Sequence, residues 1–155
     1  HETQIIALVL SADKENDPDV LSITGASAAL ALSEIPFHTT IAGVRVGLVD
    51  GQYVINPTYE QRKRSKLDIT VAGSKDGLVM VEAGAKEASE EQAIQALETA
   101  HAAIKQIVAA IDDLAREAGK KKLAVAKKEI GHAFYREVEE KVYVPLTEAV
   151  RESAA

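Results

Sequence analysis

Residues 41–55 read Ile-Ala-Gly-Val-Arg-Val-Gly-Leu-Val-Asp-Gly-Gln-Tyr-Val-Ile, and this stretch decides the fold class. The apolar run of residues 41–49 predicts a strand, and Asp50-Gly51 predicts a tight turn. Residues 52–55 then predict a returning strand. The stretch therefore predicts a β-hairpin.

Further elements are predicted on both sides of this hairpin. Residues 67–72 and 78–82 are apolar runs separated by a glycine-containing turn, which predicts a second hairpin. Residues 20–33 predict a helix for which Asp17 is the expected N-cap. Ser89-Glu90-Glu91-Gln92 is a capping box that predicts the start of a long helix ending at Ala118. These elements favour an α+β fold, with helices on one face of a sheet, followed by an all-α segment.

The long helix carries apolar residues at intervals of three and four. This spacing predicts one stripe that packs on the sheet. His101 lies on the same stripe, where we expect a buried, hydrogen-bonded side chain. The apolar members expected to cover the sheet are Ile94, Leu97, Ile104, Val108 and Ile111.

The ends of the chain are predicted from weaker patterns. The continuously apolar core of residues 3–12 predicts a strand with both faces covered. Residues 59–65 predict one exposed helical turn. Residues 123–153 predict a second helical region, interrupted near Pro145. We place a domain boundary between residues 1–119 and 120–155, at a basic run that we expect to be a solvated linker. Its lysines are Lys120, Lys121, Lys122, Lys127 and Lys128.

The composition of the chain disfavours several classes of function. The net charge of −6 argues against nucleic-acid binding by the whole surface, so an RNA contact would need a local basic patch. Aromatic residues make up 4% of the chain and there is no Trp, which disfavours a surface that grips single strands mainly by stacking. The absence of Cys excludes disulfides and thiolate metal sites, and fits a cytoplasmic protein. The apolar run of residues 5–10 is too short to cross a membrane.

Three further motifs carry a family resemblance. Residues 25–37 read Gly-Ala-Ser-Ala-Ala-Leu-Ala-Leu-Ser-Glu-Ile-Pro-Phe, residues 65–74 read Ser-Lys-Leu-Asp-Ile-Thr-Val-Ala-Gly-Ser, and residues 78–83 read Leu-Val-Met-Val-Glu-Ala. In this order and spacing, together with residues 41–49, they resemble the bacterial polynucleotide phosphorylases (polyribonucleotide nucleotidyltransferases). The resemblance covers residues 2–119, as the C-terminal half of the first RNase PH-like core. The remaining tail resembles the start of the helical linker domain.

The resemblance implies a mixed sheet of the RNase PH-like (ribosomal S5 domain 2-like) type. It also implies a parent enzyme that degrades RNA from the 3′ end with inorganic phosphate and releases nucleoside diphosphates. That enzyme would use Mg²⁺ bound outside this segment, form a homotrimer, and contain a second RNase PH-like core in the same chain. Because the only Met is Met80 and the chain opens at His1, we expect a piece of a longer protein that lacks the first half of its core.

The phosphate site of the family maps onto degenerate positions here. In the catalytic core, a serine-rich helix start binds phosphate through hydroxyls and amides, aided by the helix dipole. The matching residues in this chain are Asp17, Pro18 and Asp19. Two carboxylates repel phosphate and Pro18 removes an amide donor. The resemblance therefore implies that phosphate does not bind at this helix start.

The metal site of the family is also degenerate. The catalytic core carries two Asp residues and a Lys that help to hold the divalent metal and stabilise the transferring phosphoryl group. The matching positions here are Arg62, Asp68 and Thr70, so only Asp68 keeps the expected residue. A single carboxylate is a poor metal site. We therefore expect no catalytic residue and no metal site in this segment, which resembles the non-phosphorolytic first core.

Arg62, Lys63, Arg64 and Lys66 form the densest basic patch and are the candidate RNA-binding residues. A solvated loop is the alternative. Two other functions stay open: a catalytic RNase PH-type domain with a divergent site, and a stand-alone RNA-binding or assembly module without enzymatic activity.

Overall fold

The computed structural model describes residues 2–126 and 131–153. The chain divides into two compact units, residues 1–123 and residues 124–155.

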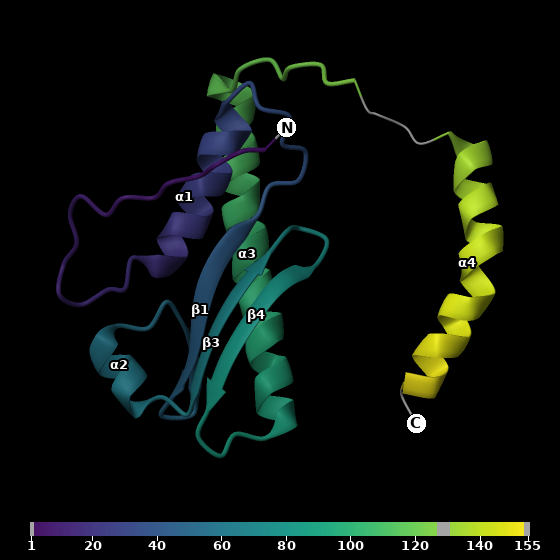
Figure 1. The fold of residues 1–155 in the computed structure, drawn as a ribbon. Coiled ribbons are helices and arrows are strands. Elements are labelled where there is room, and N and C mark those ends of the chain that lie inside the picture. The colour runs from purple at the N-terminus through teal and green to yellow at the C-terminus, as the bar shows by residue number, and fades with distance from the viewer. Residues whose placement is uncertain (1, 127–130, 154–155) are drawn as a thin grey trace. The chain divides into compact units, whose positions relative to one another are not determined.

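The first unit is built on a four-stranded sheet with the strand order β2-β1-β3-β4 (Figure 1). All three strand pairings are antiparallel, so the described strands do not form the mixed sheet that was expected, whereas the α+β class is confirmed. Asp50 and Gly51 have φ angles of 51° and 83°, which confirms the tight turn of the first hairpin. The strands are β1 (Ala42–Val49), β2 (Gln52–Ile55), β3 (Leu67–Gly73) and β4 (Leu78–Ala85).

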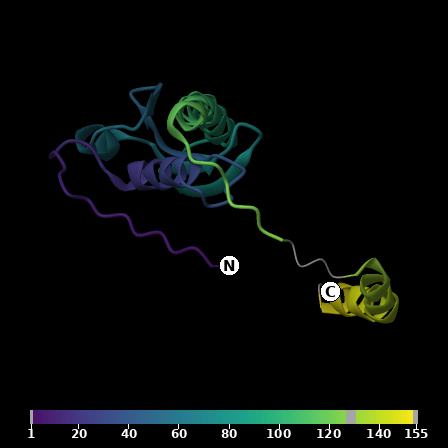
Figure 2. The same cartoon turned by 90° about the horizontal axis from the view of Figure 1, so that it is seen from above.

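Helix α3 (Glu90–Ala118) lies across one face of the sheet, and is seen nearly end-on in Figure 2. It begins at the predicted capping box, in which Ser89 and Gln92 bond each other's backbone amides. Alternate residues of β1 and β3 point toward the helix and form the core with it. The largest fully buried side chains of this core are Val44, Val46, Leu67, Ile69, Val71, Ile104 and Val108.

The start of the predicted stripe on α3 is wrong. Ile94 is 57% exposed, and the small residues Ala96 and Ala100 are fully buried in its place. The later positions Ile104, Val108 and Ile111 are buried as predicted. The N-terminal half of the helix therefore contributes alanines to the core.

The predicted hydrogen bond of His101 is confirmed. It is half-buried, and its Nε2 lies 3.1 Å from the carbonyl oxygen of Ser74 in the β3–β4 turn. The histidine therefore joins α3 to the second hairpin.

Helix α1 (Asp19–Leu32) packs beside β1 and against α3. Strand β2 pairs with β1 only from Val46 onward, so the earlier part of β1 has an edge without a strand beside it. Polar side chains bond the backbone along this edge. Ser27 accepts from Ile41 N at 3.0 Å, Thr24 bonds both Gly43 N and Gly43 O at 3.1 and 3.4 Å, and Asn56 accepts from Arg45 N at 2.9 Å.

The predicted helical turn at residues 59–65 is confirmed as the short helix α2 (Tyr59–Arg64), none of whose residues is buried. Its start is fixed by a capping box between Thr58 and Gln61, a pattern that sequence reasoning missed. The amide of Tyr59 donates to the carbonyl of Glu15 at 2.9 Å. This bond attaches the loop before α1 to the start of α2.

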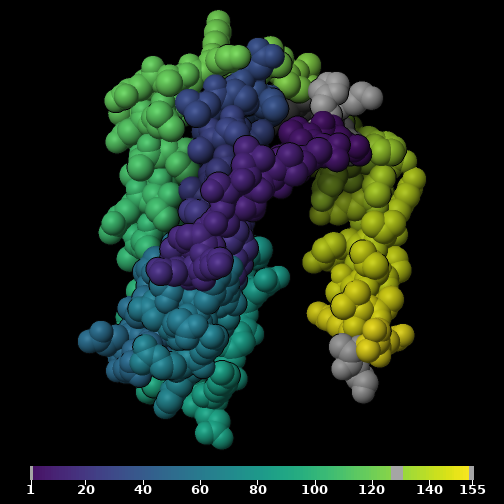
Figure 3. Space-filling model, turned by 90° about the vertical axis from the view of Figure 1, so that its left-hand side faces the viewer, coloured from purple at the N-terminus to yellow at the C-terminus, as the bar shows by residue number. Residues whose placement is uncertain are grey.

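The predicted strand at residues 3–12 is wrong. Residues 2–12 have no regular secondary structure and are exposed along their whole length. Figure 3 shows them running along α1, from which a hollow of 500 Å³ separates them. A strand needs backbone partners on a neighbouring strand, and none of the described strands pairs with these residues.

The second unit contains helix α4 (His132–Ser153), and none of its residues is buried. The predicted interruption near Pro145 is wrong, because the helix continues through it. Proline removes one amide donor from the helix, while the other hydrogen bonds of the turn can persist. In residues 2–126 and 131–153, no helix combines the length and the hydropathy that crossing a membrane requires.

Candidate functional site

The candidate site lies on the face of the sheet opposite α3. Because side chains alternate along a strand, Arg45 and Asp68 point away from the core residues Val46 and Ile69. Arg45 is the one charged residue of β1, and Asp68 is the one charged residue of β3. The antiparallel register places these two residues on neighbouring strands.

Asp68 joins two guanidinium groups. Its Oδ1 accepts from Arg45 Nη1 at 2.5 Å, and its Oδ2 accepts from Arg62 Nη2 at 2.9 Å and Nε at 3.2 Å. Arg62 comes from α2, so the contact ties this helix to the sheet. Both oxygens of the one remaining acidic position are thus occupied by cations of the protein itself.

Each arginine also holds a carboxylate at the start of α1. Arg45 Nη2 forms an ion pair with Asp19, and Arg62 Nη1 bonds Asp17 Oδ2 at 2.6 Å. We refer to Asp17, Asp19, Arg45, Arg62 and Asp68 as the ion network. Arg45 is its most buried member, since 12% of its side chain is exposed. Its Nε is buried and has no hydrogen-bond partner among the described residues.

The predicted cap of α1 is wrong in detail. The N-cap residue is Pro18, in helical conformation and without a side-chain cap, and the helix begins at Asp19. Asp17 Oδ1 nevertheless accepts from Asp19 N at 3.3 Å, and Asp19 Oδ1 accepts from Val20 N at 2.6 Å. Asp17 is drawn away from the capping position because Arg62 binds its other oxygen. The first amides of α1 are therefore bonded by carboxylates of the chain.

The charges of the network favour the ionised forms of Asp68 and Arg45. Partial burial raises the pKa of Asp68, but hydrogen bonds from Arg45 and Arg62, with the attraction of their charges, outweigh burial and hold this pKa below its usual range. Partial burial lowers the pKa of Arg45, but hydrogen bonds to Asp68 and Asp19 outweigh it and raise this pKa above its usual value. Asp68 and Arg45 thus stabilise each other's charged form.

Thr70, the third degenerate position, is placed beside the network. It lies opposite Arg45 in the β1–β3 register and opposite Glu82 of β4. Its side chain is 8% exposed. Thr70, Arg45, Asp68 and Glu82 line an open hollow of 250 Å³ on the sheet. No cation stands at position 70 to balance Glu82.

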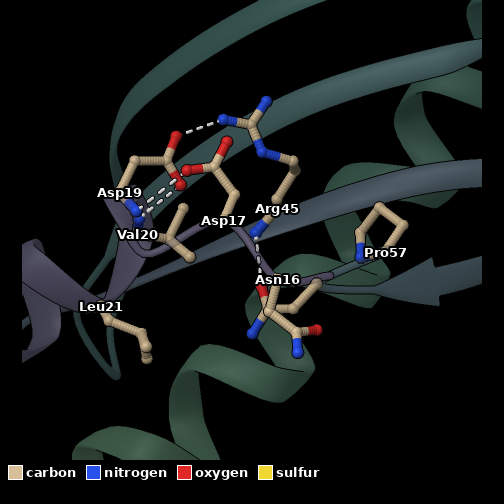
Figure 4. Close-up of a pocket in the computed structure, with 8 residues that line it drawn as sticks. Asn16, Asp17, Asp19, Val20, Leu21, Arg45 and Pro57 are labelled. Atoms are coloured by element: carbon tan, nitrogen blue, oxygen red, sulfur yellow. Dashed lines mark hydrogen bonds and ion pairs between the residues drawn. The ribbon is translucent and has the colours of Figure 1, made fainter. Parts of the chain in front are cut away.

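A separate cavity of 190 Å³ adjoins the start of α1 (Figure 4). Its lining includes Asp17 and Asp19, the stem of Arg45, and the apolar side chains of Val20 and Pro57. Figure 4 shows the carboxylate of Asp19 directed at the guanidinium of Arg45. The charged groups on this wall therefore satisfy one another rather than point into empty space.

The predicted basic patch is divided by the structure. Arg62 belongs to the ion network and is 24% exposed. Lys63 pairs with Glu60 at 2.6 Å and Arg64 pairs with Asp50 at 2.9 Å, and both basic side chains are more than half exposed. Lys66 is exposed and forms no ion pair with a described residue. Lys63, Arg64 and Lys66 are thus the accessible members of the patch.

Four of the five network residues were identified as site positions from the sequence, whereas Arg45 was missed. One signal was available: a single charge inside an otherwise apolar strand calls for a partner. Across residues 2–126 and 131–153, no group of three or more His, Asp or Glu side chains is arranged to hold a metal ion. The carboxylates and guanidinium groups of the ion network bind one another, and this is the chemistry that the arrangement supports.

The sequence of this chain matches a known protein family and two proteins that share one name. Residues 39–103 match the 3′ exoribonuclease family, domain 2. The chain is similar to two proteins named polyribonucleotide nucleotidyltransferase. It is 51% identical to that of Acidobacterium capsulatum over 97% of this chain and 19% of that protein. It is also 51% identical to that of Koribacter versatilis, over 96% of this chain and 18% of that protein. The chain thus spans about a fifth of the length of these curated relatives.

A solved structure shares the architecture. The crystal structure of rice (Oryza sativa) Rrp46 matches with a TM-score of 0.55 and 19% sequence identity, over 68% of this chain and 49% of that one. This likeness supports the RNase PH-like fold.

Proposed function

Because this chain is related along nearly its whole length to the polyribonucleotide nucleotidyltransferases and carries domain 2 of the 3′ exoribonuclease family, we propose that it is a segment of a phosphorolytic exoribonuclease. The whole protein would shorten RNA from the 3′ end with inorganic phosphate and release nucleoside diphosphates. Within it, residues 1–119 would be the C-terminal half of the first RNase PH-like core. Residues 120–155 would begin the helical linker domain.

We further propose that this core is non-phosphorolytic and serves as architecture. The ion network is the observation that carries this proposal. Phosphoryl transfer needs donors for the attacking phosphate and a cation for the developing charge. Here the carboxylates of Asp17 and Asp19 bond the first amides of α1, and two arginines occupy both oxygens of Asp68. Both oxygens of Asp68 and the first amides of α1 are therefore engaged within the chain and are not available to a metal ion or to phosphate. The Nε of Arg45 has no partner among the described residues, but it is buried.

The chemistry would then take place in the second RNase PH-like core of the same chain. Mg²⁺ and inorganic phosphate would bind there, outside this segment. A homotrimer in the cytoplasm is the assembly that the family resemblance implies. This segment would support the RNA path and hold the catalytic core in position.

Activity tests the non-phosphorolytic assignment. In the full-length protein, Asp68→Asn should leave kcat for phosphorolysis of poly(A), with phosphate and Mg²⁺, within about twofold of wild type, because a lowered kcat reports a lost transition-state interaction and this proposal places Asp68 outside the reacting centre. The isolated chain should release no nucleoside diphosphate. The measurement is the rate of ADP release, with thermal melting to check that each variant is folded. ADP release by the isolated chain that Asp68→Asn abolishes would overturn the assignment.

RNA contact is proposed for the accessible basic residues. Their ion pairs with Glu60 and Asp50 are exposed, so they cost little to exchange for phosphate. Replacing Lys63, Arg64 and Lys66 together by Ala in the full-length protein should weaken binding of single-stranded RNA. The slope of log K against log salt should become shallower by about 2, because each lost phosphate contact removes about 0.7 from it.

The matched control replaces three other exposed lysines, Lys105, Lys120 and Lys121, by Ala. It changes the net charge by the same amount at other places on the first unit. Equal losses of affinity and slope in both triple variants would show a general charge effect, and no loss in the first would assign these residues to a solvated loop.

A further inference from the structure

The first unit extends a few residues beyond the end of α3. Helix α3 ends at Ala118, whereas the compact unit extends to Leu123. We propose that residues 120–123 form a clasp that fastens the end of α3 to the C-terminal end of α1. The ammonium of Lys122 provides the charged contact of this clasp, and Leu123 is the last residue of the first unit.

Lys122 provides the central contact of the clasp. Its Nζ donates to three backbone carbonyls at the end of α1, those of Leu30 and Ala31 at 2.8 Å and that of Ser33 at 2.7 Å. Carbonyls in the last turn of a helix lack amide donors from a following turn, and the negative end of the helix dipole favours a cation there. Leu30 O also accepts from Ser33 N at 3.2 Å and from Ser33 Oγ at 2.9 Å, so Lys122 adds to the capping of this helix end. Helix α1 has no basic residue in its own last turn. The cation is supplied from 92 residues further along the chain.

Backbone hydrogen bonds flank this contact on both sides. Lys120 N donates to Leu32 O at 2.9 Å, and Leu123 N donates to Glu34 O at 2.8 Å. The two bonds hold residues 120–123 alongside the end of α1. Together with the three bonds of Lys122, they account for five links between segments that are far apart in sequence.

Gly119 makes the turn into the clasp possible. It is the C-cap of α3, and its amide donates to Ala115 O at 2.9 Å. A Cβ at this position would lie 2.2 Å from that same carbonyl oxygen, which no side chain tolerates. The glycine therefore permits a close approach here rather than a left-handed backbone, since its φ is −71°.

The clasp corrects the expectation that this basic run is a solvated linker. Lys120 and Lys121 are exposed, but Lys122 is half-buried and fully engaged. Lys127 and Lys128 lie outside the described residues. Three consecutive lysines thus differ in environment, which offers controls within one run of sequence.

The first test is amide hydrogen exchange on the full chain. Replacing Lys122 by Met keeps a long apolar stem and removes the charge. The amides of Lys120 and Leu123 should then exchange at least about tenfold faster, because hydrogen bonds to a charged group are among the stronger ones. The amides of Val44 and Val46 in β1 should keep their rates. Lys121→Met is the matched control and should change neither set.

The second test needs no variant and decides the matter if Lys122→Met unfolds. Limited acetylation of the wild-type chain with an amine-reactive ester, followed by mass spectrometry, compares the three lysines. An ammonium held by three carbonyls should react at least about tenfold more slowly at Lys122 than at Lys120 and Lys121. Equal labelling of the three, or unchanged exchange at Leu123 in a folded Lys122→Met variant, overturns the clasp.

Discussion

Replacing Ile104 by Ala is expected to lower the free energy of unfolding by about 3 kcal/mol, through lost apolar burial and the cavity that remains. Ile104 is fully buried where α3 meets β1 and β3. Ile94 makes the matched control, since the sequence assigns both residues to the same apolar stripe. Its side chain is 57% exposed, so Ile94→Ala should change stability by no more than about 0.5 kcal/mol.

The measurement is urea unfolding of both variants, followed by circular dichroism. A large loss for Ile104→Ala with little change for Ile94→Ala is the pattern expected from the packing of α3. Equal losses at the two positions would mean that Ile94 is buried in solution, and that the helix lies on the sheet in a different rotation.

Replacing Arg45 by Met is expected to destabilise the first unit by about 1–3 kcal/mol. The substitution removes the cation that Asp19 and Asp68 share, and it leaves Asp68 with one arginine. The figure stays below that of a fully buried pair because both carboxylates are more than a third exposed. Arg64→Met is the control, because its pair with Asp50 is exposed on both sides and should contribute no more than about 0.5 kcal/mol.

Acid should reduce the difference between wild type and Arg45→Met. The folded-state pKa of Asp68 lies below its unfolded value, so its contribution is complete above the unfolded pKa and is lost as the pH falls through the folded one. Unfolding measured at neutral pH and at successively lower pH tests this. A difference that grows on acidification would contradict the charge network as the source of the effect.

The sequence was sufficient for the strands and helices whose signals are local. The Asp50-Gly51 turn and the capping box at Ser89 depend on residues within a few positions, and the structure has both. The rotation of α3 about its own axis does not follow from local signals. The helix has apolar residues on neighbouring faces, and the face with small residues can pack on the sheet. Ala96 and Ala100 permit that approach, and no local pattern states which face will be chosen.

Long-range partners explain the remaining differences. Residues 3–12 have the composition of a buried strand, but a strand forms only where another strand accepts its hydrogen bonds. Arg45 was overlooked because its partners come from α1 and β3, and only the folded chain brings them together. Asp17 illustrates the reverse case, since a residue that suits a helix cap is drawn to Arg62 instead.

The side chains that line the open part of β1 also determine how this sheet behaves toward other chains. An incoming strand would need the amides of Ile41, Gly43 and Arg45, and each is already bonded to an oxygen of a folded neighbour. Those three positions therefore offer no template for strand addition, the step by which exposed sheet edges seed fibrils and domain-swapped oligomers. At Ile41 and Gly43 this protection comes from Ser27 and Thr24 of α1, so at these positions helix docking and resistance to aggregation are acquired together during folding.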